Sequence, residues 1–585
     1  NPFLRKLFGE IAGVDMPDSI AWAVDDVVKL LKHADMAAIL RDFGKGKGKE
    51  DPVVHFYETF LAAYDPKMRE IRGVYYTPEP VVGYIVRSID HLLKTRFNRP
   101  KGLADENTLI LDPACGTGTF LYFVIDLIHQ KFAKQAGAWD DYVAEHLLNR
   151  VFGFELLMAP YAVAHLKLGM QLQETGYRFG SDQRLGIYLT NTLEEAAKKS
   201  EQLFAAWVAE EANAAAEIKR DKPILVILGN PPYSGISANR GEWITCLVQD
   251  YRRVDGRPLG EKKVWLADDY VKFLRFAQWR IAQTGQGIVG MITNHGFLDN
   301  PTFRGMRQSL LRDFDEIHVF DLHGSTKKRQ RPPRGGSDEN VFDIQQGVAI
   351  TVLVRLAKHC APGRVFHAEL WGGRREKYDR LLESDISTVP WRELSPSTPY
   401  YFFVPRTEKH RREYERCWKF TDAMPLCVAG FITARDHFVI DFSRGDLLSR
   451  IEEFADPGVS DAEVRNKYFA GRGSDKYPDG DTRGWKVPQA RKRVQSDKSW
   501  SERTKVCFYR PFDTRSVYWA EWMVDWPRPE LSRHMLAGVN MAIQVCRQSV
   551  TDEWGHVLVA KGITECCYLS NKTKEIGYSA PLYLY

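Results

Sequence analysis

An apolar run that stops at two consecutive prolines constrains this chain more than any other stretch of it. Residues 223–229 read Pro-Ile-Leu-Val-Ile-Leu-Gly, and Asn230-Pro231-Pro232-Tyr233 follows. A short apolar run of this length predicts a buried strand. Proline has no N–H donor and fixes φ, so the strand must end at Asn230 and the residues after it form a stiff turn. Open α/β sheets bind ligands at that carboxyl edge, so this turn is a candidate functional site.

The same turn carries chemistry suited to a planar amine. The side-chain oxygen of Asn230, together with a nearby backbone carbonyl, can accept both hydrogens of an exocyclic amino group and bring its nitrogen toward a nucleophilic geometry. The ring of Tyr233 can stack on the base that carries the amine. The alternative interpretation is an ordinary junction between a strand and a turn, and the sequence upstream bears on that choice.

Upstream, another strand leads into a glycine-rich turn. Residues 109–121 read Leu-Ile-Leu-Asp-Pro-Ala-Cys-Gly-Thr-Gly-Thr-Phe-Leu. Gly116 and Gly118 let the backbone approach a ligand at the N-terminus of the helix that follows. The nicotinamide-binding fingerprint is not met, because a third glycine at its spacing and an acidic residue about 20 positions further on are both missing. Instead, the strand at 150–154 ends at Glu155, a carboxylate suited to accept the two ribose hydroxyls of an adenosyl ligand.

The order of apolar segments predicts a doubly wound α/β sheet with a further region on each side. Residues 1–70 read as helices, whereas strands and helices alternate from 71 to about 365. From 366 onward the alternation gives way to short strands, aromatic clusters and turns, which indicates a separate, mixed α+β domain. The strands expected in the middle region lie near 109–112, 150–154, 186–190, 223–229, 287–293, 316–321 and 347–354.

Asp-Pro-Ala-Cys-Gly-Thr-Gly at 112–118 followed by Asn-Pro-Pro-Tyr at 230–233 is a strong pair of motifs. In this order the chain resembles gamma-class DNA adenine-N6 methyltransferases, which use S-adenosylmethionine and place a target-recognition domain after both motifs. Within that class it is similar to the methyltransferase and specificity portion of Type ISP restriction-modification enzymes. Residues 51–66, 72–80 and 508–515 carry that closer likeness.

The resemblance implies an enzyme that flips an adenine out of double-stranded DNA and methylates it from S-adenosylmethionine, within a restriction-modification system. It implies a helical coupler segment (1–70), a Rossmann-like methyltransferase domain (71–365) and a truncated target-recognition domain (366–585). Family members carry a nuclease and an ATPase motor upstream in a longer polypeptide. In this chain the Gly-Lys run at 44–49 does not fit a Walker loop, because its first glycine is misplaced and no Ser or Thr follows the lysine.

Candidate site residues follow from the same resemblance. The catalytic set is the turn Asn230, Pro231, Pro232 and Tyr233. Thr77 and Pro78 also fit the N-cap and first position of a helix at 79–88, so a well-capped helix is the alternative for them. The cofactor-binding candidates are Tyr76, Thr77, Pro78, Asp112, Ala114, Cys115, Gly116, Glu155 and Asn191, with Asn191 placed against the cofactor adenine and Cys115 in a packing role.

Two regions are candidates for DNA contact. The basic loop at 325–336 would bring its cations to phosphates beside the site, although such a charge run is often only solvated. Phe342, after this loop, would sandwich an extruded adenine against Tyr233, or else belong to the core. Near the far end, Arg510 and Arg515 are candidates because arginine reads guanine edges bidentately. The basic-loop candidates are Lys327, Lys328, Arg329, Arg331 and Arg334.

Composition is compatible with this interpretation without proving it. The net charge of +5 among 27% charged residues permits DNA binding only if the positive charge is concentrated on one face. Nine scattered cysteines with no CxxC spacing indicate neither a zinc site nor a disulfide framework, and a reducing cytoplasm fits best. The chain shows no apolar run long enough to span a membrane. It begins with Asn1 and stops in an expected strand, which suggests a piece of something longer.

Other functions remain open at this point. A non-catalytic, sequence-specific DNA-binding module would use the same fold with a cofactor only to order its recognition surface, although the intact motifs argue against it. Within the same chemistry, cytosine-N4 methyltransferases and glutamine-side-chain methyltransferases also use Asn-Pro-Pro-Tyr. The cytosine enzymes more often have Ser or Asp at the first position, and the glutamine enzymes lack a large trailing domain.

Overall fold

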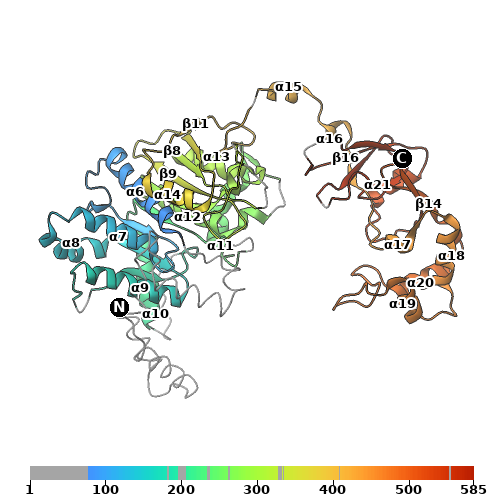
Figure 1. The fold of residues 1–585 in the computed structure, drawn as a ribbon, viewed down its shortest axis with the longest axis horizontal. Coiled ribbons are helices and arrows are strands. Elements are labelled where there is room, and N and C mark those ends of the chain that lie inside the picture. Colours follow the sequence, from blue (N-terminus) through green and yellow to red (C-terminus); the bar gives the residue numbers. More distant parts are fainter. Residues whose placement is uncertain are drawn as a thin grey trace, which may run out of the picture. The chain divides into compact units, whose positions relative to one another are not determined.

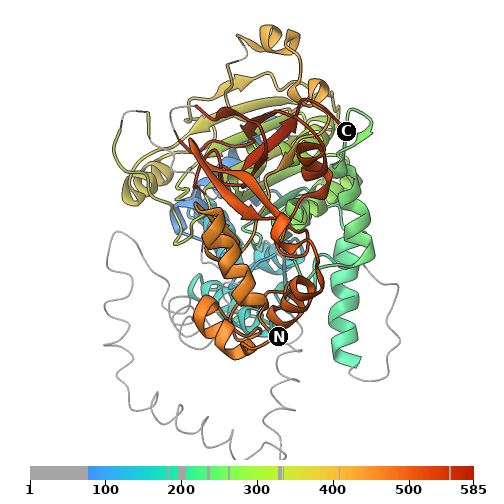
Figure 2. The same ribbon diagram turned by 90° about the vertical axis from the view of Figure 1, so that its right-hand side faces the viewer.

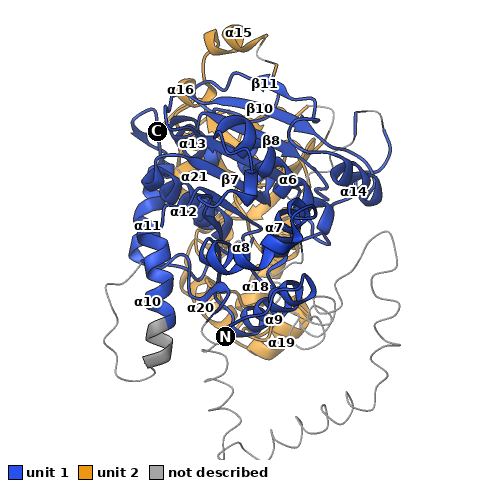
Figure 3. Cartoon of the chain, turned by 90° about the vertical axis from the view of Figure 1, so that its left-hand side faces the viewer, with its two compact units in different colours: residues 1–406 blue, residues 407–585 orange. Residues whose placement is uncertain are grey.

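The computed structural model describes two compact units, residues 1–406 and residues 407–585 (Figure 1, Figure 3). The expected helices of residues 1–70 lie outside the described residues. Among the helices of the described ranges, none combines the length and the apolar character that a bilayer crossing requires. The ranges that the structure describes are 77–180, 183–195, 206–233, 237–260, 264–326, 332–333, 335–407, 409–551, 555–572 and 574–585.

The first unit is built on a nine-stranded sheet in the order β11-β10-β8-β9-β7-β4-β1-β2-β3. Strands β3, β2, β1, β4 and β7 run parallel, and β9 is antiparallel to its neighbours β7 and β8. All seven strands expected from the sequence are confirmed. The strands are β1 (Ile110–Asp112), β2 (Val151–Glu155), β3 (Gly186–Leu189), β4 (Val226–Gly229), β7 (Gly287–Asn294), β8 (Glu316–Asp321), β9 (Val348–Arg355), β10 (Arg364–Glu369) and β11 (Arg392–Leu394).

Helices cover both faces of this sheet, which explains why its strands read as almost unbroken apolar runs. Alternate residues of each strand enter two separate hydrophobic cores, one on each face. The doubly wound α/β fold is therefore confirmed. One core packs against α6 (Glu79–Arg96), α7 (Thr119–Lys131), α8 (Trp139–Glu145), α9 (Met158–Glu174) and α14 (Arg374–Glu383), and the other against α10 (Ala206–Arg220), α11 (Glu242–Val248), α12 (Asp269–Thr284) and α13 (Arg304–Asp313).

The chain order of the sheet reverses between β1 and β4. Helix α7 leads from β1 to β2 over one face, whereas α11 and α12 lead from β4 to β7 over the other. The turns that leave β1 and β4 therefore diverge at the carboxyl edge, and the space between such turns is where open α/β sheets bind ligands. The glycine-rich turn and the Asn230 turn are these two.

The first unit extends past the boundary at residue 365 expected from the sequence. β10 pairs with β8 and β11 pairs with β10, so residues up to 394 continue the sheet. Helix α14 and the loop after it bind to α6: the guanidinium of Arg87 donates to the carbonyls of Leu381 and Ser384 at 2.6 and 2.9 Å, and the Ile386 N–H donates to Ser88 Oγ at 3.0 Å. The compact unit ends after Arg406.

The second unit combines helices and short strands in a mixed α+β fold (Figure 2). It has a hydrophobic core of its own. Its strands are short, and they form two four-stranded sheets in the orders β12-β19-β16-β17 and β13-β15-β14-β18. These strands are β12 (Val428–Ala429), β13 (Ile440–Asp441), β14 (Thr504–Arg510), β15 (Asp513–Tyr518), β16 (Ala542–Cys546), β17 (Val557–Ala560), β18 (Ile563–Thr564) and β19 (Gly577–Pro581), and the helices are α15 (Arg411–Arg416), α16 (Phe420–Ala423), α17 (Asp436–Val439), α18 (Arg444–Ala455), α19 (Asp461–Phe469), α20 (Val487–Ser496) and α21 (Pro529–Leu536).

Candidate active site

The glycine-rich turn after β1 has one open and one closely packed glycine. Gly116 and Gly118 both lie in the left-handed region, with φ of 54° and 81°, where a side chain is strained. A Cβ at Gly118 would stand 3.3 Å from Cβ of Ala164 on α9, so this glycine allows α7 and α9 to pack. A Cβ at Gly116 would meet nothing within 4 Å. The backbone at Gly116 is therefore accessible to a ligand.

Glu155, at the end of β2, ties its own turn to the glycine-rich turn. Its Oε2 accepts the N–H of Gly116 at 2.9 Å, and its Oε1 accepts the N–H groups of Leu156 and Leu157, each at 2.8 Å. Burial raises the pKa of this carboxyl, although the three N–H groups oppose that shift. A carboxylate has about four acceptor positions, so one remains for a ligand hydroxyl.

Asp112, at the end of β1, has no exposed surface. Its Oδ1 accepts the Ala114 N–H at 3.1 Å, and its Oδ2 has no hydrogen-bond partner among the described residues. Burial, and then the nearby Glu155 carboxylate, raise the pKa of Asp112 to about 8, so the group is neutral at pH 7. A Cβ at Gly229 would lie 2.7 Å from Asp112 Oδ1, so β1 and β4 meet closely here. Asp112 therefore supports the glycine-rich turn through its hydrogen bond to Ala114, and it does not line an open surface.

The Asn230 turn is held by three side-chain hydrogen bonds. Asn230 Nδ2 donates to Thr77 Oγ1 at 3.0 Å, and Asn230 Oδ1 accepts the Tyr233 hydroxyl at 2.6 Å. The same hydroxyl lies 3.0 Å from the carbonyl of Ile292 on β7. Burial, and then the negative charge of Asp268, hold the pKa of Tyr233 well above its usual value. Both polar functions of Asn230 are thus engaged within the protein.

Thr77 is not the helix N-cap that the alternative interpretation predicts. The N-cap residue of α6 is Pro78, one position later, and no side chain caps this helix end. The hydroxyl of Thr77 instead accepts the amide of Asn230, a contact between residues 153 positions apart in sequence. Local spacing could not reveal this partner. Thr77 is therefore part of the support for the Asn230 turn.

Asn191 and Cys115 lie beside this edge with their polar groups occupied. Asn191 Oδ1 accepts the Leu193 N–H at 3.1 Å, and its Nδ2 is 3.0 Å from both Glu194 Oε1 and Asn239 Oδ1. Cys115 is buried, and burial raises the pKa of its thiol well above the usual value. Its sulfur would lie 3.0 Å from a Cβ at Gly153, so it packs where β2 has no side chain.

The DNA-contact candidates divide into three groups. The candidates of the basic loop lie outside the described residues, namely Lys327, Lys328, Arg329, Arg331 and Arg334. The cofactor candidate Tyr76 also lies outside them. Phe342 is 4% exposed and belongs to the core on the α6 face, so its ring is not accessible to an extruded base in this structure.

The two recognition arginines are paired with acids of their own unit. Arg510 donates to Glu565 at 2.6 Å and stacks on Tyr509, with 3.9 Å from its guanidinium carbon to the ring centroid. Arg515 pairs with Asp513 at 2.8 Å and lies 4.1 Å from the Phe442 ring centroid. To read a base, each guanidinium would have to leave or share its carboxylate partner.

Sequence reasoning missed two features of this edge. Asp268, before α12, is a buried carboxyl whose Oδ1 has no partner among the described residues, and burial raises its pKa to about 7. Two adjacent acidic residues before a helix were the only signal for it, and they are common at helix starts. The other feature is a cluster of His295, which follows β7, with Asp321 and His323 at the end of β8. No spacing in the sequence brings His295 to the other two.

Fold and site together define a Rossmann-like methyltransferase domain followed by a separate α+β domain. Residues 48–312 match the model of the N-6 DNA methylase family, and residues 422–585 match the model of the Type ISP C-terminal specificity domain. The chain thus contains a region of the N-6 DNA methylase family followed by a Type ISP specificity region, in agreement with the resemblance seen in the sequence. No curated protein matches the chain.

Solved structures share this architecture. The chain is similar to DrdV in its DNA complex, determined by cryo-electron microscopy, with 24% identity and a TM-score of 0.62 over 91% of this chain and 52% of that one. It is also similar to a nuclease-deletion mutant of the Type ISP enzyme LlaGI with a DNA substrate mimic, with 20% identity and a TM-score of 0.64 over 100% and 48% of the two chains. The ATP-dependent Type ISP enzyme LlaBIII bound to DNA is similar as well, with 22% identity and a TM-score of 0.64 over 100% of this chain and 40% of that one.

These identities establish a shared fold. The chain spans about half the length of DrdV and LlaGI, and less of LlaBIII. The activities and partners of those longer proteins therefore enter only as proposals for this one.

Proposed function

We propose that this chain is the methylating and sequence-reading part of a restriction-modification enzyme, a DNA adenine-N6 methyltransferase that uses S-adenosylmethionine. The observation that carries the proposal is the position of Asn230 and Tyr233 at the carboxyl end of β4, beside the glycine-rich turn of β1, inside a segment that matches the N-6 DNA methylase family. An amine acceptor and a stacking ring thus lie next to a turn suited to an adenosyl ligand.

The residues present fit S-adenosylmethionine. Gly116 leaves open space in front of its backbone, and Glu155 keeps about one acceptor position for a ribose hydroxyl. Ala114 and Cys115 form the rest of the turn, and Asn191, two residues after β3, would face the adenine of the cofactor, as the resemblance implies. When bound, the cofactor supplies a methyl group on a sulfonium, which the target amine can attack directly. Thr77 and Pro78 would border its methionine end together with Tyr76.

The chain's own residues would then prepare the amine. Asn230 Oδ1 and a backbone carbonyl of the turn would accept the two amine hydrogens, while Pro231 and Pro232 keep these acceptors in place. Tyr233 would stack on the flipped base, which offsets part of the few kcal/mol that unstacking costs, at about 1–3 kcal/mol per base. The Tyr233 hydroxyl must first release Asn230 Oδ1.

Recognition of the DNA sequence is assigned to the second unit, and DNA cleavage is assigned to modules of the full-length enzyme. The specificity match at 422–585 supports target recognition by the second unit, on double-stranded DNA. The full-length enzyme would also carry nuclease and ATPase motor modules, as Type ISP enzymes do, and would act on DNA in the cytoplasm.

Methyl transfer from radiolabelled S-adenosylmethionine to genomic DNA tests the proposal, followed by sequencing of the modified positions. The expected product is N6-methyladenine within one short sequence motif. Label in N4-methylcytosine would favour the cytosine alternative. Tight DNA binding without any transfer would favour the non-catalytic DNA-binding module.

A further inference from the structure

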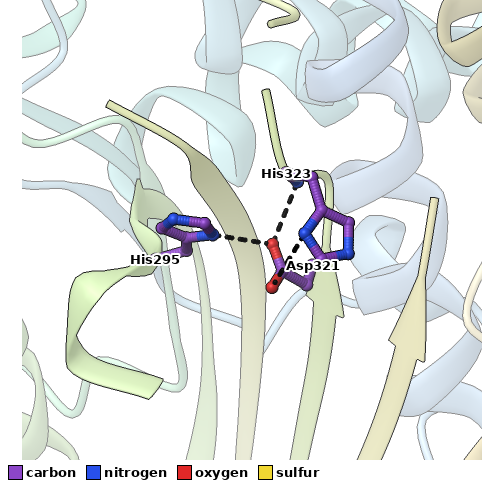
Figure 4. A group of neighbouring side chains, drawn as sticks. All are labelled: His295, Asp321 and His323. Carbon is purple, nitrogen blue, oxygen red and sulfur yellow. Dashed lines mark hydrogen bonds and ion pairs between the residues drawn. The ribbon is translucent and has the colours of Figure 1, made fainter. Parts of the chain in front are cut away.

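Two histidines and an aspartate converge at the carboxyl ends of β7 and β8 (Figure 4). His295 follows β7 directly, Asp321 ends β8, and His323 comes two residues later. His295 Nδ1 lies 3.0 Å from Asp321 Oδ1, and His323 Nδ1 lies 3.5 Å from Asp321 Oδ2. One ligand atom from each residue can be chosen so that all lie within 4.8 Å of one another. The two imidazoles thus approach the two oxygens of one carboxylate.

The backbone around the cluster makes room for it. Strand β9 lies between β7 and β8 in the sheet, and it begins at Val348. At Gly347, just before β9, a Cβ would stand 2.4 Å from the His295 ring, so only glycine admits the imidazole. The His295 N–H donates to the Gly347 carbonyl at 3.0 Å, and the Val348 N–H donates to the His323 carbonyl at 3.1 Å. The ends of two non-adjacent strands therefore meet over the start of β9.

Hydrogen bonding within the cluster does not explain the buried position of the His323 ring. Its side chain is 4% exposed, yet neither ring nitrogen makes a hydrogen bond within the described residues. Buried polar atoms are normally satisfied, and an exception calls for an explanation. Its φ of 53° lies in the left-handed region, which histidine adopts only uncommonly. The ring is also fixed by stacking on Trp371, with centroids 3.4 Å apart.

Further groups surround the cluster as they surround protein metal sites. Glu369 Oε1 lies 3.4 Å from His323 Nε2, on the side of the ring away from Asp321. A carboxylate at the second nitrogen of a metal-ligating histidine fixes the ring and its tautomer. His367 faces the same side of the sheet as Glu369, two residues earlier on β10, and its Nε2 has no partner among the described residues.

We propose that His295 Nδ1, a carboxylate oxygen of Asp321 and His323 Nδ1 bind one divalent transition-metal ion, with Zn²⁺ the best fit. Two neutral imidazoles and one carboxylate are a donor set that zinc uses at about 2.0–2.2 Å, and a fourth position stays open. The ion gives His323 Nδ1 a closer partner than its 3.5 Å contact with Asp321, and it joins the end of β7 to the end of β8. The ion would hold the end of β7, and Ile292, whose carbonyl accepts the Tyr233 hydroxyl, lies on that strand three residues before His295.

Metal analysis of the full chain tests this site without reference to methylation. The purified protein is stripped with a chelator, reloaded with Zn²⁺ or Co²⁺, desalted and assayed by mass spectrometry for bound metal. We expect one equivalent in the unmodified protein and loss of that equivalent in Asp321→Asn and in His323→Asn. Asparagine tolerates left-handed φ, so the second change does not strain the backbone further. His295→Gln provides a third variant if one of these misfolds.

Two controls separate this site from other binding. His318→Gln removes another buried imidazole on β8, which pairs with Glu316 at 3.2 Å outside the cluster, and it should keep the metal. The second candidate group, Glu565, Cys566 and Cys567, would show thiolate-to-Co²⁺ charge transfer, whereas the proposed nitrogen and oxygen donors give ligand-field bands alone. The proposal is overturned if no metal is retained, if the three cluster variants retain it, or if its loss follows only Cys566→Ser and Cys567→Ser.

Discussion

The hydroxyl of Tyr233 donates to Oδ1 of Asn230 over 2.6 Å, so the atom proposed to accept the target amine is occupied by the ring proposed to stack on the target base. A flipped adenine would have to displace this bond. The carbonyl of Ile292 lies 3.0 Å from the same hydroxyl and can keep it satisfied after Asn230 is released. Exchange between these two acceptors therefore leaves no buried donor unpaired, which keeps the cost of opening the site low.

Asn230→Ala should separate chemistry from binding. The change removes the proposed amine acceptor but leaves the glycine-rich turn and the second unit untouched. We expect methyl transfer to fall by orders of magnitude, each tenfold loss being about 1.4 kcal/mol of transition-state stabilisation, with little change in affinity for DNA or S-adenosylmethionine. Single-turnover transfer and calorimetry measure the two quantities. Asn107→Ala, an exposed asparagine at the opposite edge of the sheet, is the matched control. Near-normal turnover by Asn230→Ala would contradict the assigned role.

Tyr233→Phe and Tyr233→Ala should differ, because only the second removes the ring. Phenylalanine keeps the stacking surface and frees Asn230 Oδ1, so transfer should stay within about tenfold, or roughly 1.4 kcal/mol, of the unmodified rate. Alanine should lower both the rate and the flipped-base population. A duplex with 2-aminopurine at the target position reports unstacking by fluorescence, which should rise with the unmodified protein and Tyr233→Phe and rise less with Tyr233→Ala. Equal fluorescence for all three proteins would rule out stacking on Tyr233.

Glu155 has a double role that two substitutions can resolve. Glu155→Ala removes both the ribose acceptor and the bond to the Gly116 N–H, so affinity for S-adenosylmethionine should fall roughly ten- to a hundredfold, about 1.5–3 kcal/mol. Glu155→Gln keeps one acceptor oxygen and should lose less. Calorimetry measures the affinities, with Glu174→Gln on the exposed end of α9 as control. Unchanged affinity in a folded Glu155→Ala protein would remove Glu155 from the cofactor site.

At the carboxyl edge of the nine-stranded sheet, the sequence predicts those features of the candidate site that consecutive residues encode. The strand before Asn230, the left-handed Gly116 and Gly118, and Glu155 at a strand end all follow from local apolar runs, prolines and glycines. Each of these signals acts on the backbone within a few residues, so one sequence suffices to place it.

The parts that escape prediction depend on partners far away in the chain. For Thr77 the sequence leaves a cofactor contact and a helix cap open until Asn230 is folded against it, and for Phe342 it leaves a base contact and the core open until packing on the α6 face buries the ring. β10 and β11 belong to the large sheet through pairing with β8 and with each other, which the residues of the two strands do not reveal. Such contacts are decided by tertiary packing, which outweighs local preference.

Asp112→Asn should flatten the dependence of stability on pH. The folded pKa of Asp112 is about 8, raised by burial from 3.8, so between these values the folded protein holds a proton that the unfolded chain has lost. The free energy of unfolding therefore falls as pH rises, by about 1.4 kcal/mol per pH unit for this one proton. Asparagine removes the proton exchange and keeps an oxygen for the Ala114 N–H. Urea denaturation from about pH 5 to about pH 8, without cofactor, should show the shallower slope for Asp112→Asn than for the exposed control Asp140→Asn.

Removal of the second unit should abolish sequence specificity and spare cofactor binding. A chain cut after Arg406 keeps the whole nine-stranded sheet and every proposed cofactor residue, and the deleted part has a separate core. We expect S-adenosylmethionine binding by calorimetry to remain within a few fold, while methylation of the recognition motif disappears.

A second truncation, cut after residue 365, is the matched comparison. It removes α14, β11 and most of β10, and so uncovers β8 and the face of α6 that Leu381 and Ile386 cover. At about 25 cal/mol per Å² of newly exposed apolar surface, this loss should lower the melting temperature well below that of the 406 truncation. If the 365 truncation is equally stable, the strands beyond it are dispensable and the unit boundary lies earlier. If the 406 truncation still methylates the same motif, recognition resides in the first unit.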